Sequence, residues 1–515
     1  MPQQLDLRVH PNNLENKEWL KKEAAKKLRI SEDAIVEYTI LRRSIDARGR
    51  TPMYQLKVEV IMEGEPIVDE ALHFNFKKIT SDDSRVLIIG AGPAGYFAAL
   101  RCLELNLKPI VVERGYDVRL RRKDLRNIQQ FNEVNPDSNY CFGEGGAGTY
   151  SDGKLYTRSN KRGNVRKVLQ ILVEHGAKTD ILVDAHPHIG SNKLPQVVQS
   201  IRETIESNGG EVRFDHRVVD FLVKDKKIYG VRCQNGKEIY GDATLLATGH
   251  SARDIYHLCH THGVKLEFKP FAIGVRMEHP QALIDKIQYN QSRDGINLPA
   301  ASYGLSCQAD GHGVYSFCMC PGGLIVPAST SPGELVVNGM SLSRRDSPYA
   351  NAATVVTLDK NPNAEDPFGG LQYQEELEQA FFNYSDKGMT APAQRLTDFV
   401  EGKMSVNLND TSYIPGIYSA PIHDMLPDWI VSSLRKGIRQ FEKRMRGYYT
   451  EEAQLIGLES RTSAPIRIPR DKENFMSDDI DGLFPCGEGA GYAGGILSAA
   501  LDGDKIADKI KEYFQ

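Results

Sequence analysis

The chain has 515 residues, of which 40% are hydrophobic and 26% are charged, and its 64 lysine and arginine residues nearly balance 68 aspartate and glutamate residues. A formal charge of −4 gives no support to a protein that binds nucleic acid or a membrane surface along its whole length. The longest apolar stretch, residues 86–100, is broken by glycine and proline and is shorter than the ~20 residues that cross a bilayer. No basic segment followed by an apolar run opens the chain, and eight cysteines are too few for a disulfide scaffold, so we expect a cytoplasmic protein without a secretory signal.

Residues 1–80 form the first predicted unit, a small α+β domain. Apolar and polar residues alternate over 5–9, 35–43 and 54–62, which is typical of half-buried strands. Residues 16–28 instead carry apolar side chains at helical spacing, with a lysine-rich opposite face.

A buried parallel strand is predicted at residues 86–89, because this run is continuously apolar and β-branched. A glycine-rich turn, a helix over 96–105 and a second buried strand over 109–113 follow, and together they make a βαβ unit. The pattern continues with a helix at 193–208, a buried strand at 243–247 and, between them, short strands at 211–214, 218–223, 228–234 and 237–240.

Residues 265–465 lack a dinucleotide-binding pattern and mix strands with helices, whereas a strand, a glycine-rich turn and a helix return from Gly482. The predicted fold is therefore α/β: a Rossmann-like nucleotide-binding domain is interrupted by an inserted α+β domain and preceded by a small N-terminal α+β domain. The predicted boundaries are 1–80, 81–264, 265–465 and 466–515.

The first motif is Gly90-x-Gly92-x-x-Gly95, between a predicted strand and a predicted helix. In such a turn the first glycine allows the tight bend, the second lets the backbone approach a pyrophosphate, and the third lets helix and strand pack closely. Free N–H groups at the helix N-terminus then bind the phosphates. Glu113 ends the next strand, where a carboxylate can accept hydrogen bonds from an adenosine ribose.

Two further motifs follow in order, Leu246-Ala247-Thr248-Gly249 and a glycine-rich segment over 482–496 that contains Gly487-Glu488. With all three, the sequence resembles the large group of flavoproteins that have two dinucleotide-binding domains. The resemblance implies FAD as the cofactor, with Glu488 holding the ribityl chain and the helix after residue 495 pointing its N-terminus at the flavin pyrimidine edge. A helix dipole favours the negative charge that reduced flavin carries there.

A narrower resemblance covers most of the chain. Residues 139–155, with Gly143-Glu144-Gly145-Gly146-Ala147-Gly148 at their centre, look like the signature of an uncharacterised bacterial family of FAD-dependent dehydrogenases. Residues 44–48, 271–280 and 459–465 support this resemblance. So many backbone N–H groups on glycines can lie against a flavin and its pyrophosphate without side-chain collision.

These motifs define an expected set of cofactor-binding residues and leave the catalytic acid and base unassigned, with Glu144, Asp152, Lys154, His250 and Tyr492 as candidates by position. The expected set is Gly90, Gly92, Pro93, Ala94, Gly95, Glu113, Arg114, Gly145, Gly146, Thr149, Val218, Gly249, Gly487, Glu488, Gly494, Gly495 and Ile496.

Cysteines and histidines give weaker patterns. Cys318-x-Cys320 could be thiol-active, but residues 316–319 are typical of a buried strand, where cysteine is usually a small core residue. A flavin disulfide reductase is disfavoured because Cys102 stands alone on the helix after the first glycine motif. His257 and His260 share a helix face without a second ligand pair, so a partly exposed helix end is favoured and no metal is expected.

The functional hypothesis that these motifs favour is an FAD-dependent oxidoreductase. It would exchange a hydride or electron pair with a small organic substrate held by residues 265–465, while residues 1–80 lie outside the cofactor site. No second nucleotide-binding motif is present, so NAD(P)H would dock transiently as a donor. The alternatives are a flavin monooxygenase, a flavin-bound module without turnover, and an RNA-associated flavoprotein.

The RNA hypothesis depends on a basic stretch over residues 114–167, and thin aromatic interleaving disfavours it. Its cations are Arg114, Arg119, Arg121, Arg122, Lys123, Arg126, Arg158, Lys161, Arg162, Arg166 and Lys167. A solvated helix face or a contact to cofactor phosphates explains them as well. The sequence indicates no membrane partner and leaves the oligomeric state open.

Overall fold

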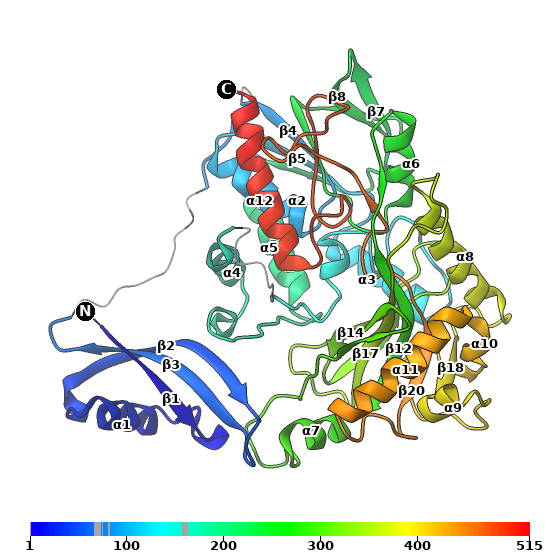
Figure 1. Ribbon diagram of the computed structural model, residues 1–515. Helices are drawn as coiled ribbons and strands as arrows, with labels where there is room; N and C mark the ends of the chain where they lie inside the picture. Colours follow the sequence, from blue (N-terminus) through cyan, green and yellow to red (C-terminus); the bar gives the residue numbers. More distant parts are fainter. Residues whose placement is uncertain (1, 66–73, 75, 81–82, 157–162) are drawn as a thin grey trace.

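The computed structural model describes residues 2–65, 74, 76–80, 83–156 and 163–515. Figure 1 shows three parts, which we name the N-terminal unit (2–65), the parallel-sheet unit (83–264 and 468–515) and the antiparallel-sheet unit (269–465). None of the described helices combines the length and apolar composition of a bilayer-crossing segment.

The N-terminal unit is an antiparallel sheet of β1 (Gln3–Val9), β3 (Met53–Met62) and β2 (Ile35–Asp46), in that order, covered by α1 (Lys17–Leu28). Alternate residues of β1 and β3 are buried against the helix, as the period-two pattern predicts. The side chain of Asn16 caps the helix by accepting the N–H of Trp19 at 3.0 Å.

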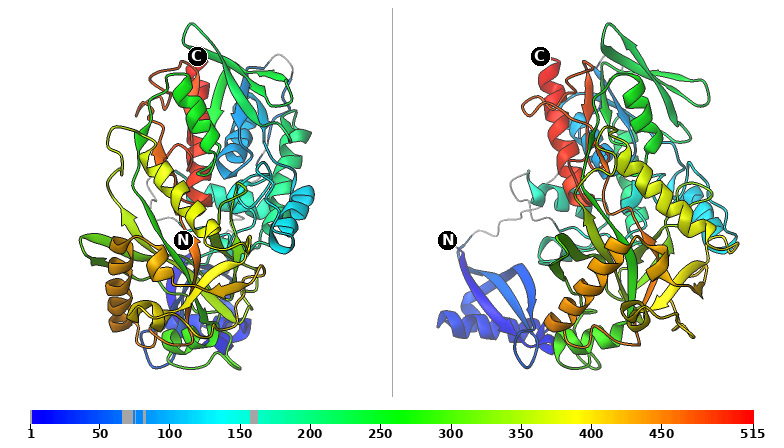
Figure 2. Two further views of the ribbon diagram at one scale, coloured as in Figure 1. Left: turned by 90° about the vertical axis from the view of Figure 1, so that its right-hand side faces the viewer. Right: turned by 45° about the vertical axis from the view of Figure 1, so that its right-hand side comes forward.

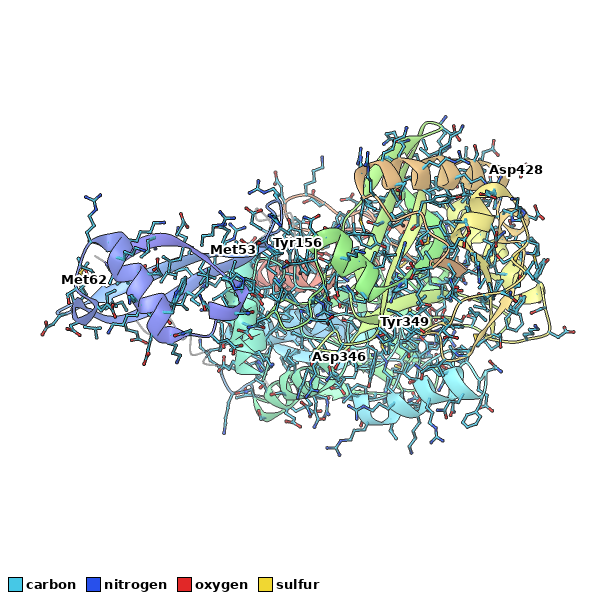
Figure 3. The ribbon with its side chains drawn as sticks, turned by 90° about the horizontal axis from the view of Figure 1, so that it is seen from below. Met53, Met62, Tyr156, Asp346, Tyr349 and Asp428 are labelled. Atoms are coloured by element: carbon cyan, nitrogen blue, oxygen red, sulfur yellow. The ribbon has the colours of Figure 1, made fainter. Side chains whose placement is uncertain are left out.

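Both other units hold the N-terminal unit in place. The Arg43 guanidinium pairs with Asp184 at 2.6 Å, and its backbone N–H donates to the Val183 carbonyl at 2.7 Å. The Tyr54 hydroxyl donates to the Asn297 carbonyl of the antiparallel-sheet unit at 3.3 Å. Figure 3 shows the Met53 end of β3 toward the rest of the chain and the Met62 end at the outer edge.

The parallel-sheet unit is built on five parallel strands. Their order is β22 (Leu483–Pro485), β10 (Ala243–Leu246), β4 (Arg85–Ile89), β5 (Lys108–Val112) and β6 (Glu211–Arg213). One face is covered by α2 (Pro93–Glu104), α4 (Val165–Glu174), α5 (Leu194–Ser207) and α12 (Ile496–Tyr513), and the other by α6 (Arg253–Thr261) and the small sheet of β7 (Val218–Lys224), β8 (Lys227–Cys233) and β9 (Glu238–Tyr240). Apolar cores on both faces explain why β4 and β5 are apolar along almost their whole length.

The closest helix packing in this unit joins α12 to α2. A methyl group added at Gly503 would lie 2.0 Å from the Ala94 carbonyl oxygen, so the two helices touch backbone to backbone. This contact brings the last helix of the chain beside the first helix of the unit (Figure 1), and with it the two glycine-rich segments that precede them.

The antiparallel-sheet unit has a seven-stranded sheet in the order β13 (Ser306–Ala309), β14 (His312–Cys320), β17 (Tyr349–Leu358), β12 (Phe271–Pro280), β20 (Gln454–Glu459), β18 (Ala391–Arg395) and β19 (Ile417–Ser419). Around it lie the hairpin of β15 (Gly323–Pro327) and β16 (Val337–Ser341) and the helices α7 (Gln281–Tyr289), α8 (Gly369–Asn383), α9 (Leu396–Glu401), α10 (Ile422–Met425) and α11 (Asp428–Arg444). The chain enters and leaves it through paired β11 (Glu267–Phe268) and β21 (Ile466–Arg467). In both views of Figure 2 the antiparallel-sheet unit lies below the parallel-sheet unit.

Candidate functional site

The carboxyl ends of four neighbouring parallel strands place the sequence motifs side by side. Gly90 follows β4, Glu113 follows β5, Gly249 lies three residues after β10, and Gly487 lies two residues after β22. Parallel strands end at one edge of a sheet, and open α/β folds bind ligands outside that edge. Segments that are almost 400 residues apart in the sequence therefore meet here, because β4 and β22 both flank β10.

Close contacts between the glycine segments confirm this proximity. A methyl group added at Gly148 would lie 2.9 Å from Ile496, and one at Gly489 would lie 2.5 Å from the Gly249 carbonyl oxygen. One at Gly487 would lie 3.1 Å from Ala94 Cβ. We call residues 90–95, 143–149, 249 and 487–496 the glycine-lined edge.

Gly90 meets the geometric demand predicted for the first glycine of the motif. Its φ is +108°, and a methyl group there would lie 2.4 Å from the Ala247 carbonyl oxygen on the neighbouring strand. Gly95 is equally constrained, because a methyl group would lie 2.0 Å from the Gly90 carbonyl oxygen. Only glycine lets the chain turn from β4 into α2 at this distance from β10.

Glu113 joins the first glycine motif to the 143–149 segment. Its buried carboxylate accepts three backbone N–H groups, from Ala91 at 2.9 Å, Gly115 at 3.0 Å and Gly143 at 2.9 Å. A carboxylate has about four acceptor positions, so one remains for a ligand hydroxyl. Glu113 therefore has a structural role in addition to the ligand contact predicted from the sequence.

A buried guanidinium on α3 (Val118–Gln130) holds the 139–146 segment from behind. Arg121 is fully buried and donates to the carbonyl oxygens of Asn139 at 2.8 Å, Tyr140 at 3.0 Å, Glu144 at 2.8 Å and Gly146 at 2.9 Å. Burial lowers the pKa of Arg121, but the four carbonyl dipoles point their negative ends at the cation.

Glu144 belongs to the same support and is fully buried. Its carboxylate accepts hydrogen bonds from the Tyr96 hydroxyl at 3.1 Å, the Val118 N–H at 2.8 Å and the Arg202 guanidinium at 2.7 Å. Burial raises the pKa of Glu144, although these hydrogen-bond donors oppose the shift. The Thr149 hydroxyl donates to the Glu144 carbonyl at 2.9 Å. Glu144 therefore orders the loop.

Two predicted residues have other contacts. The Arg114 guanidinium pairs with Asp137 at 2.9 Å and Asp254 at 3.0 Å, and it stacks over Phe142. Val218 is buried at the start of β7, in the core beneath the small sheet. Any role of either residue toward a cofactor remains a prediction.

Polar side chains meet where the antiparallel-sheet unit joins this edge. His250 Nδ1 lies 2.8 Å from Ser251 Oγ, and burial together with the charge of Arg461 lowers the pKa of His250 to about 4. Burial raises the pKa of Glu488 to about 7, opposed by the nearby charge of Lys269. Glu488 is nevertheless only partly buried, so it lies in a deep part of the molecule that solvent still reaches.

A buried ion cluster fixes this junction. Arg461, which follows β20, pairs with Glu334 at 2.8 Å and Glu378 at 2.7 Å. Arg253 of α6 pairs with the same carboxylates at 2.6 and 2.7 Å. The cluster thus ties the parallel-sheet unit to three segments of the antiparallel-sheet unit.

Comparison with known proteins identifies the family. An uncharacterized protein of Clostridium beijerinckii is 40% identical over 514 residues, which cover 96% of each chain. Family models match residues 84–271 (pyridine nucleotide-disulphide oxidoreductase), 270–462 (FAD-dependent protein, C-terminal domain-like) and 1–61 (a domain of unknown function, DUF8436). The chain belongs to an uncharacterised family of FAD-dependent oxidoreductases.

Solved structures of flavoproteins align at low similarity. The tetracycline destructase Tet(51) is 11% identical (84% of this chain, 82% of that one, TM-score 0.35), and CtdE in complex with FAD is 11% identical (84% and 86%, TM-score 0.34). The flavin-dependent brominase Bmp2 is 13% identical, over 84% of this chain and 79% of that one, with a TM-score of 0.38. Scores this low say nothing about the activity of the flavoprotein described here.

FAD is the cofactor of this family, and parts of the glycine-lined edge are sterically open. A methyl group added at Gly92 would meet only the Gly146 Cα, at 4.0 Å, and one at Gly494 or Gly495 would meet nothing within 4 Å. The first turn of α2 has no side-chain cap, and neither has that of α12. The N-terminus of α12 therefore directs free N–H groups into open space, whereas the first turn of α2 lies beside Gly146.

The remaining sequence hypotheses fall elsewhere. Of the basic stretch, Arg158, Lys161 and Arg162 lie outside the described residues, whereas Lys167 pairs with Glu104 and Asp504 at 2.9 Å. The charges of Lys167, Arg114 and Arg121 are therefore all bound by partners within the protein. His257 and His260 are exposed on α6, as predicted, and the described residues contain no group of three or more potential metal ligands.

Cavity volume does not mark the site. A cavity of about 490 Å³ lies beside Glu278 and Tyr349. A second, of about 600 Å³, lies between β11 and the 360–367 loop. The residues that line them do not belong to the glycine-lined edge.

Glu488 makes the stability of the FAD-free protein pH-dependent. Between pH 4.5 and about 7 the unfolded carboxyl is ionised whereas the folded one keeps its proton, so stability falls as pH rises through this window. Glu488→Gln removes this contribution. We expect its Tm relative to wild type to rise from pH 5 to pH 8, measured by thermal unfolding.

Glu473→Gln, which removes an exposed carboxylate from a neighbouring loop, is the control for loss of one negative charge. If the Tm difference between Glu488→Gln and wild type is the same at every pH, Glu488 does not titrate in this environment.

Proposed function

We propose that FAD lies along the glycine-lined edge, with its pyrophosphate on the first turn of α2. Gly92 and Gly146 face the space for the phosphates, and Pro93, Ala94 and Gly145 border it. The free acceptor position of Glu113 suits an adenosine ribose hydroxyl, beside Arg114 and Val218. The observation that carries this placement is the meeting of all three motifs at the ends of adjacent parallel strands.

The flavin half of the cofactor would lie between Glu488 and the N-terminus of α12. A carboxylate three residues after β22 can accept hydrogen bonds from the ribityl hydroxyls, and the uncapped N-terminus at Gly495 and Ile496 favours negative charge on the flavin. An 18-residue helix has a full macrodipole, and Gly494 and Gly495 leave its end sterically open. When bound, FAD supplies two-electron transfer by accepting or donating a hydride.

Gly92→Val tests the pyrophosphate placement. A Cβ at this position fits the protein itself, because its one neighbour is the Gly146 Cα at 4.0 Å and φ is −79°. In the presence of FAD its methyl groups would occupy the phosphate space, so we expect FAD affinity to fall about tenfold or more, the equivalent of losing one charge-assisted hydrogen bond. Flavin content after purification and FAD titration measure this.

The matched control is Gly304→Val, at an exposed glycine with open space around it and far from the motifs in the sequence. A Gly92→Val protein that retains wild-type flavin content would refute the placement.

The organic substrate would bind where the antiparallel-sheet unit faces the flavin. His250, Lys269 and Arg461 come together at this junction from β10, the start of β12 and the end of β20. The low pKa of His250 keeps its imidazole neutral near pH 7, so one ring nitrogen can donate and the other accept a hydrogen bond from a polar substrate. Lys269, held by the Ser463 hydroxyl at 3.1 Å, offers a positive charge to a polar substrate.

NAD(P)H would reduce the flavin by docking transiently over it, since the chain has one dinucleotide-binding motif. Mixing the flavoprotein with NADH or NADPH without oxygen should bleach the visible flavin band at least ~100-fold faster than in free FAD, the scale of positioning effects. Dithionite reduction is the control for a reducible flavin. If dithionite bleaches the flavin but neither NADH nor NADPH bleaches it faster than free FAD, the protein uses another electron donor.

A further inference from the structure

Cys318 and Cys320 lie on β14 at an irregularity of the sheet. The pairing of β14 with β17 shifts register between Phe317 and Cys320, and Cys318 has a φ of +45°. The sequence pattern predicts a buried strand here. The strand is present, but Cys318 is exposed while Cys320 is 1% exposed, so the prediction of burial is wrong for Cys318. The bulge turns this side chain out of the packed sheet.

Two cations surround the buried sulfur. Lys154 Nζ lies 3.7 Å from Cys320 Sγ, and Arg276 Nη2 lies 3.5 Å from it. The same Arg276 nitrogen donates to the Cys318 carbonyl at 2.7 Å, which fixes the bulge. Reactive cysteines occupy electropositive and partly exposed surroundings, whereas structural cysteines are enclosed by apolar groups. In this pair the cations lie beside the buried Cys320 sulfur, and Cys318 is the exposed member.

The nearby carboxylates do not cancel this positive field. Asp152 pairs with Lys154 at 3.1 Å but also binds Arg345 at 2.6 Å, and Glu459 faces Arg276 at 3.4 Å. Burial raises the pKa of Glu459 to about 7, although the charge of Arg276 opposes this shift. The raised pKa reduces the negative charge of Glu459 at neutral pH. Three cations thus share two carboxylates, one of them partly protonated, and the Cys320 sulfur lies among them.

We propose that Cys318 and Cys320 are a redox-active dithiol that exchanges with small-molecule thiols and disulfides. Glutathione disulfide and the two protein thiols would give one intramolecular disulfide and two molecules of glutathione. The reaction forms a Cys318–Cys320 bond, breaks the glutathione S–S bond, and passes both protons and two electrons to glutathione. In the reverse direction a glutathione thiolate attacks the exposed Cys318 sulfur, and Cys320 leaves with the negative charge beside Lys154 and Arg276.

The bulge brings the two residues close together. Cys320 Sγ lies 3.2 Å from the Cys318 carbonyl oxygen. The disulfide then forms by rotation of the exposed Cys318 side chain toward Cys320. An exposed disulfide is also of the readily reduced kind.

The test is an equilibrium titration of the purified flavoprotein in glutathione buffers that span reducing to oxidising ratios. After acid quenching and alkylation, mass spectrometry of the peptide with residues 318–320 gives the fraction that has lost two hydrogens. We expect one reversible transition, absent in Cys318→Ser and Cys320→Ser. Lys154→Met should favour the disulfide and shift the glutathione ratio at the midpoint by about tenfold, because a cation stabilises reduced Cys320. Lys154→Arg keeps the cation and should restore the wild-type midpoint.

Cys307, on neighbouring β13 and half-buried, is the internal control for unspecific oxidation. The proposal is overturned if residues 318–320 stay reduced in the most oxidising buffer, or if the Lys154→Met midpoint equals that of wild type. Neither result bears on flavin reduction by NAD(P)H, so this test is independent of the proposed function.

Discussion

The buried guanidinium of Arg121 is the interaction on which the glycine-lined edge depends. Glycines give the 143–149 segment its close approach to α2, but they give it no rigidity of their own. Four carbonyl groups of residues 139–146 share this one cation, and a methyl group at Gly143 would lie 2.6 Å from Arg121 Cδ. With these carbonyls held by the cation, the Gly143 N–H donates to Glu113. The N–H groups of Glu144, Gly145 and Gly146 donate to the carbonyls of Tyr116, Ala91 and Gly143 and fix the loop against α2. The cation therefore selects one conformation of the loop, the one on which the proposed FAD placement depends.

The second constraint is the attachment of the antiparallel sheet. Its two connections to the parallel-sheet unit are neighbouring chain segments before β12 and after β20, which alone would act as a hinge. The cluster of Arg461, Arg253, Glu334 and Glu378 closes that hinge. Buried ion pairs add little net stability, but an unmatched geometry is costly because it leaves a buried charge unpaired. The cluster thus specifies one orientation of the antiparallel sheet relative to the parallel-sheet unit.

Local patterns in the sequence predicted the elements and the edge. The apolar run of β4, the glycine turn and the acid after β5 each occupy the expected place, since short-range sterics determine them. The ion cluster escaped prediction because its members come from four separate segments between residues 253 and 461 and none has a local signature. Arg121 carried a signal that was not used: it shares the helical stripe of Val118, Leu125 and Ile128, where a charged residue must have partners. The burial of Cys318 was predicted wrongly because an alternating sequence pattern does not reveal a β-bulge.

The most direct test of this account is the FAD affinity of apoprotein with Arg121→Lys. A lysine can donate to fewer of the four carbonyls, so the loop should lose its fixed conformation. We predict a Kd for FAD that rises about tenfold or more, since at least one charge-assisted hydrogen bond is lost, while unfolding stays cooperative. Arg119→Lys, at an exposed position on the same helix, should bind FAD as the wild type does. Wild-type affinity in Arg121→Lys would contradict the claim that this guanidinium shapes the cofactor site.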